Sequence, residues 1–241
     1  MKNNVMKEII KEKLLKCEIL LTEEKLYLLE NYFQEVIRRN EIINLTSVID
    51  EKEFAEKHII DSLYLNKLFY LSESGKLIDV GTGAGIPGII LKIVRADLNI
   101  TLLDSVKKKT DFLNDVIEKL DLKNIYVIND RAENLGKNRE HRENYDYSVA
   151  RAVSNLSTLA EFCLPFVKVG GFFLAMKGEK AKEEIDGSIK AVEIMGGKIE
   201  DIISYDLPSG YKRKIIVIRK IKNTPENYPR RPGIPEKRPI K

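Results

Sequence analysis

The chain has 241 residues, of which 43% are hydrophobic and 32% charged, and its formal net charge at pH 7 is +4. This length suits one large α/β domain with a modest extension, and the composition is typical of an ordered globular protein. No apolar run approaches the ~20 residues of a membrane-spanning helix, and the mixed charges of the first residues are unlike a secretory signal. We therefore expect a cytoplasmic protein with no membrane partner, and a monomer as the default.

Cysteine and histidine are scarce, with two of each in the whole chain. That number is too small for the usual Cys/His zinc site, so we expect no metal centre. Cys17 and Cys163 lie far apart in apolar helical patterns, which favours buried free thiols over a disulfide.

Residues 5–70 are predicted to be helical. Asp50 can cap one of these helices, because a glutamate occurs three residues later and completes a capping box. His58 and Asp61 fall on the same helix. For this pair the sequence favours a surface or interface position over a catalytic role.

From residue 76 the pattern changes to short apolar strands that alternate with helices. A last pair of strands is joined by the turn-prone Pro208-Ser209-Gly210, which predicts an antiparallel hairpin. The order predicts an α/β fold with a seven-stranded, mainly parallel sheet, one antiparallel strand and helices on both faces. The expected strands are 76–80, 99–104, 124–128, 145–150, 171–177, 198–207 and 212–220, and the main helices are 86–95, 107–120, 156–167 and 179–195.

We divide the chain into a helical extension (1–70), a cofactor-binding domain (71–220) and a C-terminal tail (221–241). From Lys220 to Lys241 there are seven basic and two acidic residues, together with five of the eight prolines. Because proline removes backbone donors and disfavours helix, we expect the tail to be extended and poorly packed. Its charge suits a polyanion surface, and a solubilising tail explains that charge equally well.

The main chemical signal is the stretch Leu77-Ile78-Asp79-Val80-Gly81-Thr82-Gly83-Ala84-Gly85-Ile86-Pro87-Gly88. It places a glycine loop between a strand and a helix, where the backbone can turn tightly and unpaired N–H groups face a ligand. Asp104 ends the next strand, at the position where a carboxylate can accept hydrogen bonds from both hydroxyls of a ribose. These features predict an adenosine-type cofactor, without separating NAD from S-adenosylmethionine.

Other features favour S-adenosylmethionine. Asp79 lies inside the strand before the loop, where a carboxylate can receive a positively charged amino group but would face a pyrophosphate badly. A loop cap is the competing interpretation of Asp79. Asp130-Arg131-Ala132-Glu133 comes after the third strand, where an adenine would lie. With the terminal hairpin, this pattern is typical of class I (Rossmann-like) S-adenosylmethionine-dependent methyltransferases, and an NAD-dependent oxidoreductase is the alternative.

The segment after the fourth strand narrows the choice of methyl acceptor. The chain there has Ala150-Arg151-Ala152-Val153-Ser154 instead of the Asn/Asp-Pro-Pro-aromatic turn of enzymes that methylate exocyclic base amines. Cys163 falls in the middle of a helix, which favours core packing over a nucleophile. An acceptor that is itself nucleophilic, such as ring nitrogen 7 of guanine, would need alignment and no general base. A methyltransferase of another acceptor stays open.

Taken together, these motifs resemble the bacterial RsmG (GidB) family of 16S ribosomal RNA guanine-7 methyltransferases over nearly the whole chain. The resemblance implies methylation of guanosine 527 in the decoding-site loop, with 16S rRNA in the small ribosomal subunit or an assembly intermediate as partner. The matching stretches are Asn44-Leu45-Thr46-Ser47-Val48, His58-Ile59-Ile60-Asp61-Ser62, the glycine loop through Gly88, Thr101-Leu102-Leu103-Asp104-Ser105, Asp130-Arg131-Ala132-Glu133, Ala150-Arg151-Ala152-Val153, Lys177-Gly178 and Tyr228-Pro229-Arg230-Arg231-Pro232-Gly233.

Motif and resemblance together give a predicted cofactor site, in which Asp104 contacts the ribose. Arg151 is the candidate catalytic residue, and it can pair with the cofactor carboxylate, with an RNA phosphate or in a structural salt bridge. The predicted cofactor-binding residues are Asp79, Gly81, Gly83, Gly85, Ile86, Asp104, Ala132, Glu133 and Arg151.

Basic side chains outside the core are candidates for RNA binding. Lys107, Lys108 and Lys109 open a helix, where cations oppose the helix dipole, so a phosphate partner would explain them. A solvated charge run explains them equally well. Lys212, Arg213, Arg230 and Arg231 complete the candidate surface.

Overall fold

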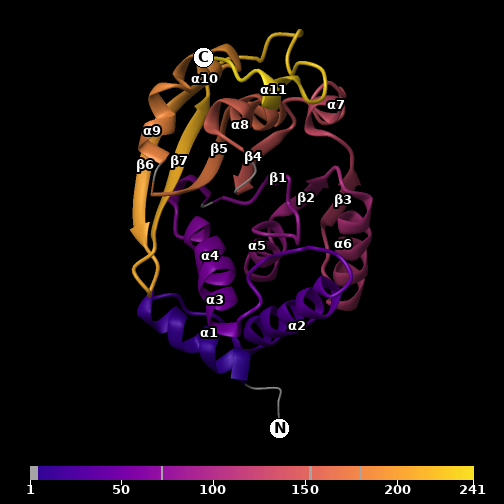
Figure 1. The fold of residues 1–241 in the computed structure, drawn as a ribbon, viewed down its shortest axis with the longest axis vertical. Coiled ribbons are helices and arrows are strands. Elements are labelled where there is room, and N and C mark those ends of the chain that lie inside the picture. Colours follow the sequence, from indigo (N-terminus) through magenta and orange to yellow (C-terminus); the bar gives the residue numbers. More distant parts are fainter. Residues whose placement is uncertain (1–4, 72, 152–153, 180) are drawn as a thin grey trace.

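The computed structural model describes residues 5–71, 73–151, 154–179 and 181–241, and its centre is one mixed sheet (Figure 1). The described strands lie in the order β3-β2-β1-β4-β5-β7-β6, and β7 runs opposite to the other six. The predicted seven-stranded sheet with one antiparallel strand and a final hairpin is confirmed. The strands are β1 (Lys76–Val80), β2 (Asn99–Asp104), β3 (Ile125–Asn129), β4 (Tyr145–Arg151), β5 (Val167–Gly178), β6 (Gly197–Asp206) and β7 (Lys212–Lys220).

The sheet separates two apolar cores, because neighbouring residues of a strand point to opposite faces. In β1, Leu77 packs into one core, whereas Ile78 and Val80 pack into the other. The first core includes α5 (Gly88–Val94), α6 (Lys107–Lys119) and the N-terminal helices, and the second includes α8 (Leu156–Cys163) and α10 (Ile189–Ile194). Helices therefore cover both faces, as the sequence predicts.

Two predicted helices are shorter than expected. The helix expected over 156–167 ends at Cys163 and passes through the 3-10 turn η3 (Leu164–Phe166), since the ring of Pro165 cannot continue an α-helix. The helix expected over 179–195 is divided into α9 (Ala181–Asp186) and α10. At the break, the Ser188 hydroxyl donates to the carbonyl of Ile185 at 2.8 Å and closes a turn.

The N-terminal extension is helical, as predicted, and it packs against α5 and α6 across the first core. Asp50 accepts the backbone N–H of Glu53 at 2.9 Å, which confirms the predicted helix cap. The helix that begins there contains a π-helical turn, a feature that is frequent at functional sites. The elements are α1 (Val5–Lys16), α2 (Glu23–Asn40), α3 (Glu51–Phe54), the π-helical turn η1 (Ala55–Ile60), α4 (Asp61–Asn66) and the 3-10 turn η2 (Phe69–Leu71).

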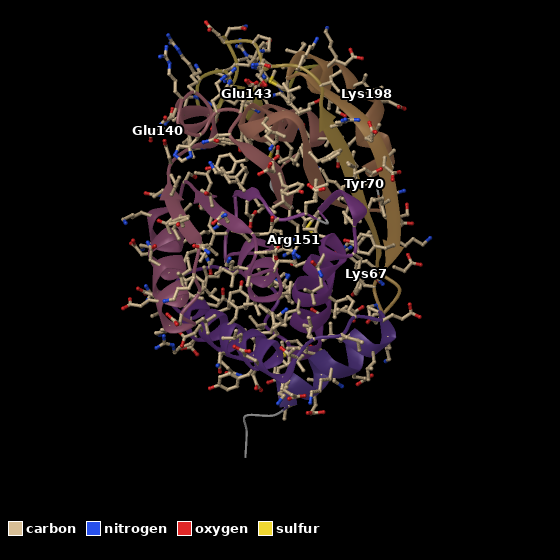
Figure 2. The ribbon with its side chains drawn as sticks, turned by 180° about the vertical axis from the view of Figure 1, so that it is seen from behind. Lys67, Tyr70, Glu140, Glu143, Arg151 and Lys198 are labelled. Atoms are coloured by element: carbon tan, nitrogen blue, oxygen red, sulfur yellow. The ribbon has the colours of Figure 1, made fainter. Side chains whose placement is uncertain are left out.

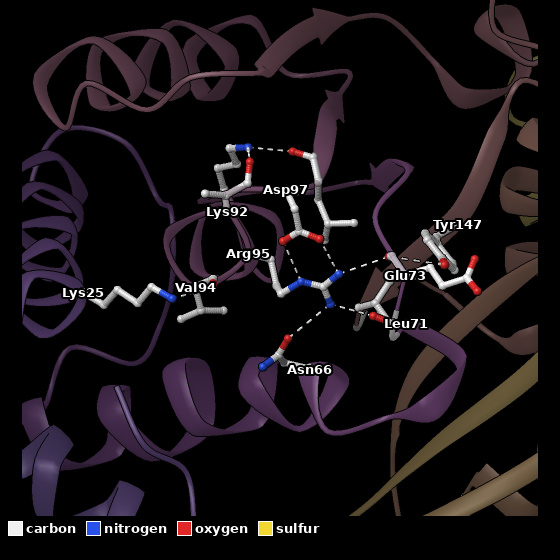
Figure 3. A network of polar contacts seen from close by, with 11 residues as sticks. Lys25, Asn66, Leu71, Glu73, Lys92, Val94, Arg95, Asp97 and Tyr147 are labelled. Atoms are coloured by element: carbon white, nitrogen blue, oxygen red, sulfur yellow. Dashed lines mark hydrogen bonds and ion pairs between the residues drawn. The ribbon is translucent and has the colours of Figure 1, made fainter. Parts of the chain in front are cut away.

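Arg95, at the end of α5, ties the extension to the sheet domain (Figure 3). Its guanidinium donates to the carbonyl of Leu71 at 2.6 Å and to that of Glu73 at 3.1 Å. The same group reaches the side chain of Asn66 at 3.4 Å and pairs with Asp97 at 2.7 Å. Because one rigid group holds the end of α4 and the start of the sheet domain, the helix that contains η1 has a fixed position over the sheet.

The tail departs from the prediction that it is extended and poorly packed. It folds back over the body and includes the short helix α11 (Ile234–Lys237), which contacts α8 (Figure 1). Proline lacks a donor but keeps its carbonyl, and the guanidinium of Arg142 donates to four backbone carbonyls, of which three belong to the tail. Pro229 and Pro235 are buried against the body. A side chain far away in sequence therefore satisfies carbonyls of the tail segment that precedes α11.

Both cysteines are buried and free, which confirms the prediction for Cys17 and Cys163. Within the described ranges, no helix is long and apolar enough to cross a membrane. The same residues contain no group of three or more His, Cys, Asp or Glu side chains that could hold a metal ion.

Candidate active site

The glycine loop joins β1 to α5 and is held at its base by β2. Gly81, Gly83 and Gly85 have positive φ angles of 72°, 61° and 94°, which side chains rarely allow. Asp104 braces the loop, because its Oδ2 accepts the N–H of Gly83 at 2.9 Å. Its Oδ1 accepts the N–H of Val106 at 2.9 Å. The end of β2 and the loop thus form one preorganised backbone surface.

Asp79 lies beneath this loop. Its Oδ2 accepts the hydroxyl of Thr82 at 2.6 Å and the N–H of Gly88 at 2.9 Å. The carboxylate is fully buried, and burial raises its pKa to about 6. These contacts are those of a loop cap. Its Oδ1 is buried without a hydrogen-bond partner, so this atom can still accept one donor from a ligand.

A first hollow, here called the acidic hollow, opens on the β2 and β3 side of the loop. Its volume is about 80 Å³, and its lining includes four carboxylates and one guanidinium. Such a lining attracts cations and repels anions such as the phosphates of a dinucleotide. The lining residues that define it are Gly81, Asp104, Asp130, Arg131, Ala132, Glu133 and Glu236.

A second hollow, here called the loop hollow, lies between the glycine loop and the N-terminal extension. It has a volume of about 130 Å³ and shares Gly81 with the acidic hollow. The lining residues that define it are Leu45, Thr46, His58, Gly81, Thr82, Gly83, Ala84, Ile86 and Arg151.

The third space, here called the basic cavity, is the largest, at about 490 Å³. It shares His58 and Arg151 with the loop hollow, so the three spaces are neighbours in series, each next to the following one across common lining residues. Its lining contains four cationic side chains and two carboxylates. The residues that define it are Val48, Lys57, His58, Asp61, Arg151, Met176, Lys177, Glu184 and Arg213.

Seven of the nine predicted cofactor-binding residues therefore lie along the two smaller hollows. Asp79 and Gly85 do not line them: Asp79 caps the loop from below, and a Cβ at Gly85 would meet the side chains of Ile89 and Leu113. Gly85 allows the close approach of α5 and α6, so its part in the motif is structural. The residues along the hollows are Gly81, Gly83, Ile86, Asp104, Ala132, Glu133 and Arg151.

Arg151 stands at the junction of the loop hollow and the basic cavity, near the middle of the molecule in Figure 2. Its Nη1 donates to the carbonyl of Lys57 at 2.6 Å and pairs with Asp61 at 3.2 Å. Its Nη2 donates to Nδ1 of His58 at 2.8 Å. The sequence leaves three pairings open for Arg151, and the contacts described here are those of the structural salt bridge. Because Arg151 also lines both spaces, a ligand in either of them can reach it.

His58 is held as a neutral ring. Arginine can only donate, so Nδ1 must accept, and the proton lies on Nε2, which is 2.8 Å from the hydroxyl of Thr46. Burial, with the nearby charge of Arg151, lowers the pKa of His58 to about 3. Because Arg151 occupies the Nδ1 lone pair and Nε2 carries a proton, His58 cannot remove a proton from a substrate.

Asp61 is likewise fully engaged. Its Oδ1 accepts the hydroxyl of Tyr205 at 2.7 Å and lies 3.6 Å from Nε of Arg213, while its Oδ2 pairs with Arg151. His58 and Asp61 are 7% and 3% exposed and contact residues of β4, β6 and β7, so of the expected surface or interface position the surface alternative is wrong. Their one-turn spacing on a helix was the available signal, but the sequence does not show that β4, β6 and β7 cover that face.

The predicted RNA-binding cations differ in how free they are. Lys107 pairs with Asp111 at 2.6 Å, whereas Lys108 is exposed beside it at the start of α6. Lys212 is exposed and lies 3.5 Å from Glu179. Lys109 and Arg213 are half-buried, and only Arg213 lines the basic cavity.

Arg230, another predicted RNA-binding cation, is engaged in an ion pair within the protein. Its guanidinium makes a bidentate pair with Glu161 at 2.6 and 2.9 Å, and its backbone N–H donates to the same carboxylate at 2.7 Å. Glu161 is 1% exposed, so this is a buried structural pair and Arg230 is not a free cation for RNA. Arg231, the next residue, is exposed.

The sheet order, the glycine loop after β1 and the carboxylate that ends β2 define a Rossmann-like fold of the methyltransferase class. Fibrillarin from Aeropyrum pernix, solved with natively bound S-adenosyl-L-methionine, is 19% identical, with a TM-score of 0.50 over 66% of this chain and 73% of that one. A methyltransferase from Pyrococcus furiosus is 12% identical, with a TM-score of 0.55 over 78% and 95%. These structures share the fold with the chain.

The family is shown by sequence. The GidB family model, described as rRNA small subunit methyltransferase G, matches residues 25–215. A protein of Pelotomaculum thermopropionicum with the name Ribosomal RNA small subunit methyltransferase G is 48% identical over 98% of this chain and 100% of its own length. A protein of the same name from Acetivibrio thermocellus is 51% identical over 86% of each. The chain belongs to this family and is a methyltransferase, as the motifs predict.

Proposed function

We propose that this protein transfers a methyl group from S-adenosylmethionine to ring nitrogen 7 of guanosine 527 in 16S ribosomal RNA. The observation that carries the proposal is the series of joined spaces, from the acidic hollow through the loop hollow to the basic cavity. A cationic methyl donor suits the acidic end and a polyanionic acceptor suits the basic end. The family's description and the relatives' names support ribosomal RNA as the substrate.

The residues of the two smaller hollows fit the cofactor. The Asp104 carboxylate would hold the ribose hydroxyls, and Glu133 with Asp130 would lie beside the adenine. The unpartnered Oδ1 of Asp79 is the one buried carboxylate oxygen beneath the loop that still lacks a donor among the described atoms. When bound, S-adenosylmethionine supplies an electrophilic methyl group on a sulfonium centre.

The basic cavity is suited to position an acceptor, and neither His58 nor Asp61 at its junction with the loop hollow is available as a general base. The neutral ring of His58 and the carboxylate of Asp61 both have their acceptor atoms occupied by Arg151 or its neighbours. Ring nitrogen 7 of guanine carries a lone pair and no proton, so its methylation needs alignment and no base. Because neither His58 nor Asp61 is free to act as a base, the junction favours this acceptor over an exocyclic amine.

The direct test is transfer of labelled methyl from S-adenosylmethionine to small-subunit RNA that lacks the modification, given as naked RNA, assembly intermediate and intact subunit. Nuclease mapping should give a single 7-methylguanine at position 527 in one or more of these substrates. Label at another nucleotide would overturn the acceptor assignment while leaving the donor intact. No label in any of them would overturn the proposed substrate.

A ligand test separates this function from a dinucleotide-dependent oxidoreductase. A ligand at 100 times its Kd stabilises a folded protein by about 2.7 kcal/mol, which raises Tm by several degrees. S-adenosylmethionine should produce this shift and NAD should not, because the acidic hollow repels phosphate. The opposite result would reject the methyl donor.

We expect the protein to act as a monomer in the cytoplasm, where small subunits are assembled.

A further inference from the structure

We propose that the C-terminal tail forms one wall of the cofactor site and that its docking tightens the binding of S-adenosylmethionine. Two tail residues make this wall: Gly233 holds the carboxylate of Glu133, and Glu236 lines the acidic hollow. The inference rests on the proposed function, since it takes the acidic hollow as the site of the cofactor's adenosine. It gives the tail a role other than contact with RNA.

The first half of the tail is anchored to the body by hydrogen bonds. Near its start, the buried ammonium of Lys220 donates to the hydroxyl of Thr224 at 2.5 Å, and Glu143 accepts the N–H of Thr224 at 2.7 Å. The guanidinium of Arg142 donates to the carbonyls of Thr224 at 2.7 Å and of Tyr228 at 2.9 Å. These bonds fix the backbone that leads toward the acidic hollow.

The decisive anchor is the Arg230–Glu161 pair. Glu161 lies on α8 and accepts both the backbone and the side-chain donors of Arg230. A buried carboxylate with this one strong cationic partner makes the docked position specific. Because Gly233 is three residues further along, the pair determines where the Gly233 N–H points.

That N–H is the link to the cofactor. It donates to Oε1 of Glu133 at 2.8 Å, and Glu133 is 2% exposed at the start of α7 (Ala132–Leu135). Gly233 has a φ angle of 79°, a backbone conformation that favours glycine and that turns the chain into α11. The turn places Glu236 beside the hollow. A carboxylate held in one orientation before the ligand arrives loses less conformational freedom on binding.

Coupling of this kind is reciprocal. If tail docking strengthens cofactor binding by some factor, then bound cofactor must strengthen tail docking by the same factor. The proposal therefore makes a claim about the unaltered protein that needs no variant: hydrogen exchange of the tail should slow when S-adenosylmethionine binds.

The test compares matched tail variants by titration calorimetry with S-adenosylmethionine. Arg230→Ala should bind the cofactor about tenfold more weakly, the size expected for loss of one charge-assisted hydrogen bond. Arg238→Ala removes the same charge from an exposed site in the tail and should leave the affinity unchanged. In the same way, Glu236→Gln should weaken binding about threefold, and Glu226→Gln, which is outside the hollow, should not.

The second measurement is hydrogen exchange of peptides covering residues 230–238 in the unaltered full-length protein. It tests the coupling between tail and cofactor even if Arg230→Ala does not fold. Slower exchange with S-adenosylmethionine supports the proposal. Equal exchange with and without the cofactor, or equal affinity for Arg230→Ala and Arg238→Ala, overturns it while the proposed function stands. If the unaltered protein does not bind S-adenosylmethionine at all, the proposed function fails and the inference fails with it.

Discussion

The acidic hollow and the basic cavity each share lining residues with the loop hollow, yet they are held together in different ways. In the acidic hollow, Asp104 is braced by backbone N–H groups of the adjacent loop, and Glu133 by one N–H of the tail. In the basic cavity, side chains from distant segments bind one another, as Arg151, Asp61 and His58 do. Backbone donors keep their positions when a neighbour is changed, whereas a buried side-chain network fails as a unit.

The difference in charge has a separate consequence. The lining of the acidic hollow carries four carboxylates against one guanidinium, and that of the basic cavity carries four cations against two carboxylates. Methyl donor and RNA are thus attracted to opposite ends, and Arg151 separates them. Variants at the two ends should therefore give different failures: loss of donor affinity at one, and loss of transfer or of RNA affinity at the other.

The largest effect is expected at Arg151. Arg151→Ala leaves the carboxylate of Asp61 and the Nδ1 of His58 buried without their main donor, and breaking a buried ion pair costs about 3 kcal/mol or more. Methyl transfer should fall by about a hundredfold or more, because the junction of the two spaces loses its shape. Chemical unfolding and single-turnover methylation measure the two losses.

Arg151→Lys is the matched control, since it keeps the charge but cannot span the Lys57 carbonyl, Asp61 and His58 together. It should recover part of the stability and little of the transfer. If Arg151→Lys transferred methyl at the normal rate, the network would matter only for its charge, and the contrast between the two ends would be lost.

The second effect is at Asp104. Asp104→Ala removes the acceptor of the Gly83 and Val106 N–H groups and the proposed acceptor of the ribose hydroxyls. The Kd for S-adenosylmethionine should rise by about a hundredfold, the equivalent of about 2.7 kcal/mol. RNA binding without cofactor should not change. Asp121→Ala, an exposed carboxylate outside the hollow, is the control in titration calorimetry, and equal affinities for the two variants would reject Asp104 as a cofactor residue.

The same contrast explains which parts of the site the sequence predicts. The strand, the glycine loop and Asp104 lie within 30 residues of one another, and their backbone geometry is determined by local patterns. His58, Asp61, Tyr205 and Arg213 meet only because the extension and the last two strands fold over β4. No periodicity in the sequence predicts that these segments come together. From the sequence alone, members of a buried ionic network can therefore be mistaken for a surface pair.

The tail differs from its prediction for a similar physical reason. Proline and basic residues locally favour an extended, solvated chain, and the sequence around 221–241 contains nothing that contradicts this. The groups that bind it lie about 70 to 100 residues away: Arg142 donates to its carbonyls, and Glu143, Glu161 and Glu133 accept its N–H groups. Tertiary contacts decided its conformation against the local preference.

The third effect depends on pH. Burial lowers the pKa of His58 from 6.5 to about 3, so between these values the unfolded chain binds one proton more than the folded chain. Stability contributed by neutral His58 is present above pH 6.5 and is lost as the pH falls toward 3. His58→Asn keeps an acceptor for Arg151 and should remove this dependence, which amounts to at most about 1.4 kcal/mol per pH unit.

Urea unfolding of the unaltered protein and of His58→Asn at several pH values measures the difference. Asp79 acts in the opposite direction, because its pKa is raised from 3.8 to about 6 and its protonated form stabilises the folded state below that range. It is present in both proteins, so its contribution cancels. A difference that does not vary with pH would mean that His58 is not held neutral.

The smallest effect concerns the surface cations, and it tests whether the basic end alone attracts RNA. Lys108 is exposed at the start of α6, three residues after Ser105 of the acidic hollow, whereas Arg213 lines the basic cavity. If both contact phosphates, each alanine variant should lower the slope of log affinity against log salt by about 0.7 to 0.9. We expect Arg213→Ala to weaken binding more, because it also frees Asp61, and Lys108→Ala to weaken it by only a few tenths of a kcal/mol to about 1 kcal/mol. Filter binding of 16S RNA fragments over a salt series measures both slopes.

An unchanged slope for Lys108→Ala beside a lowered slope for Arg213→Ala would confine the RNA to the basic end. The reverse result would show that the RNA crosses the acidic side on the lysines of α6.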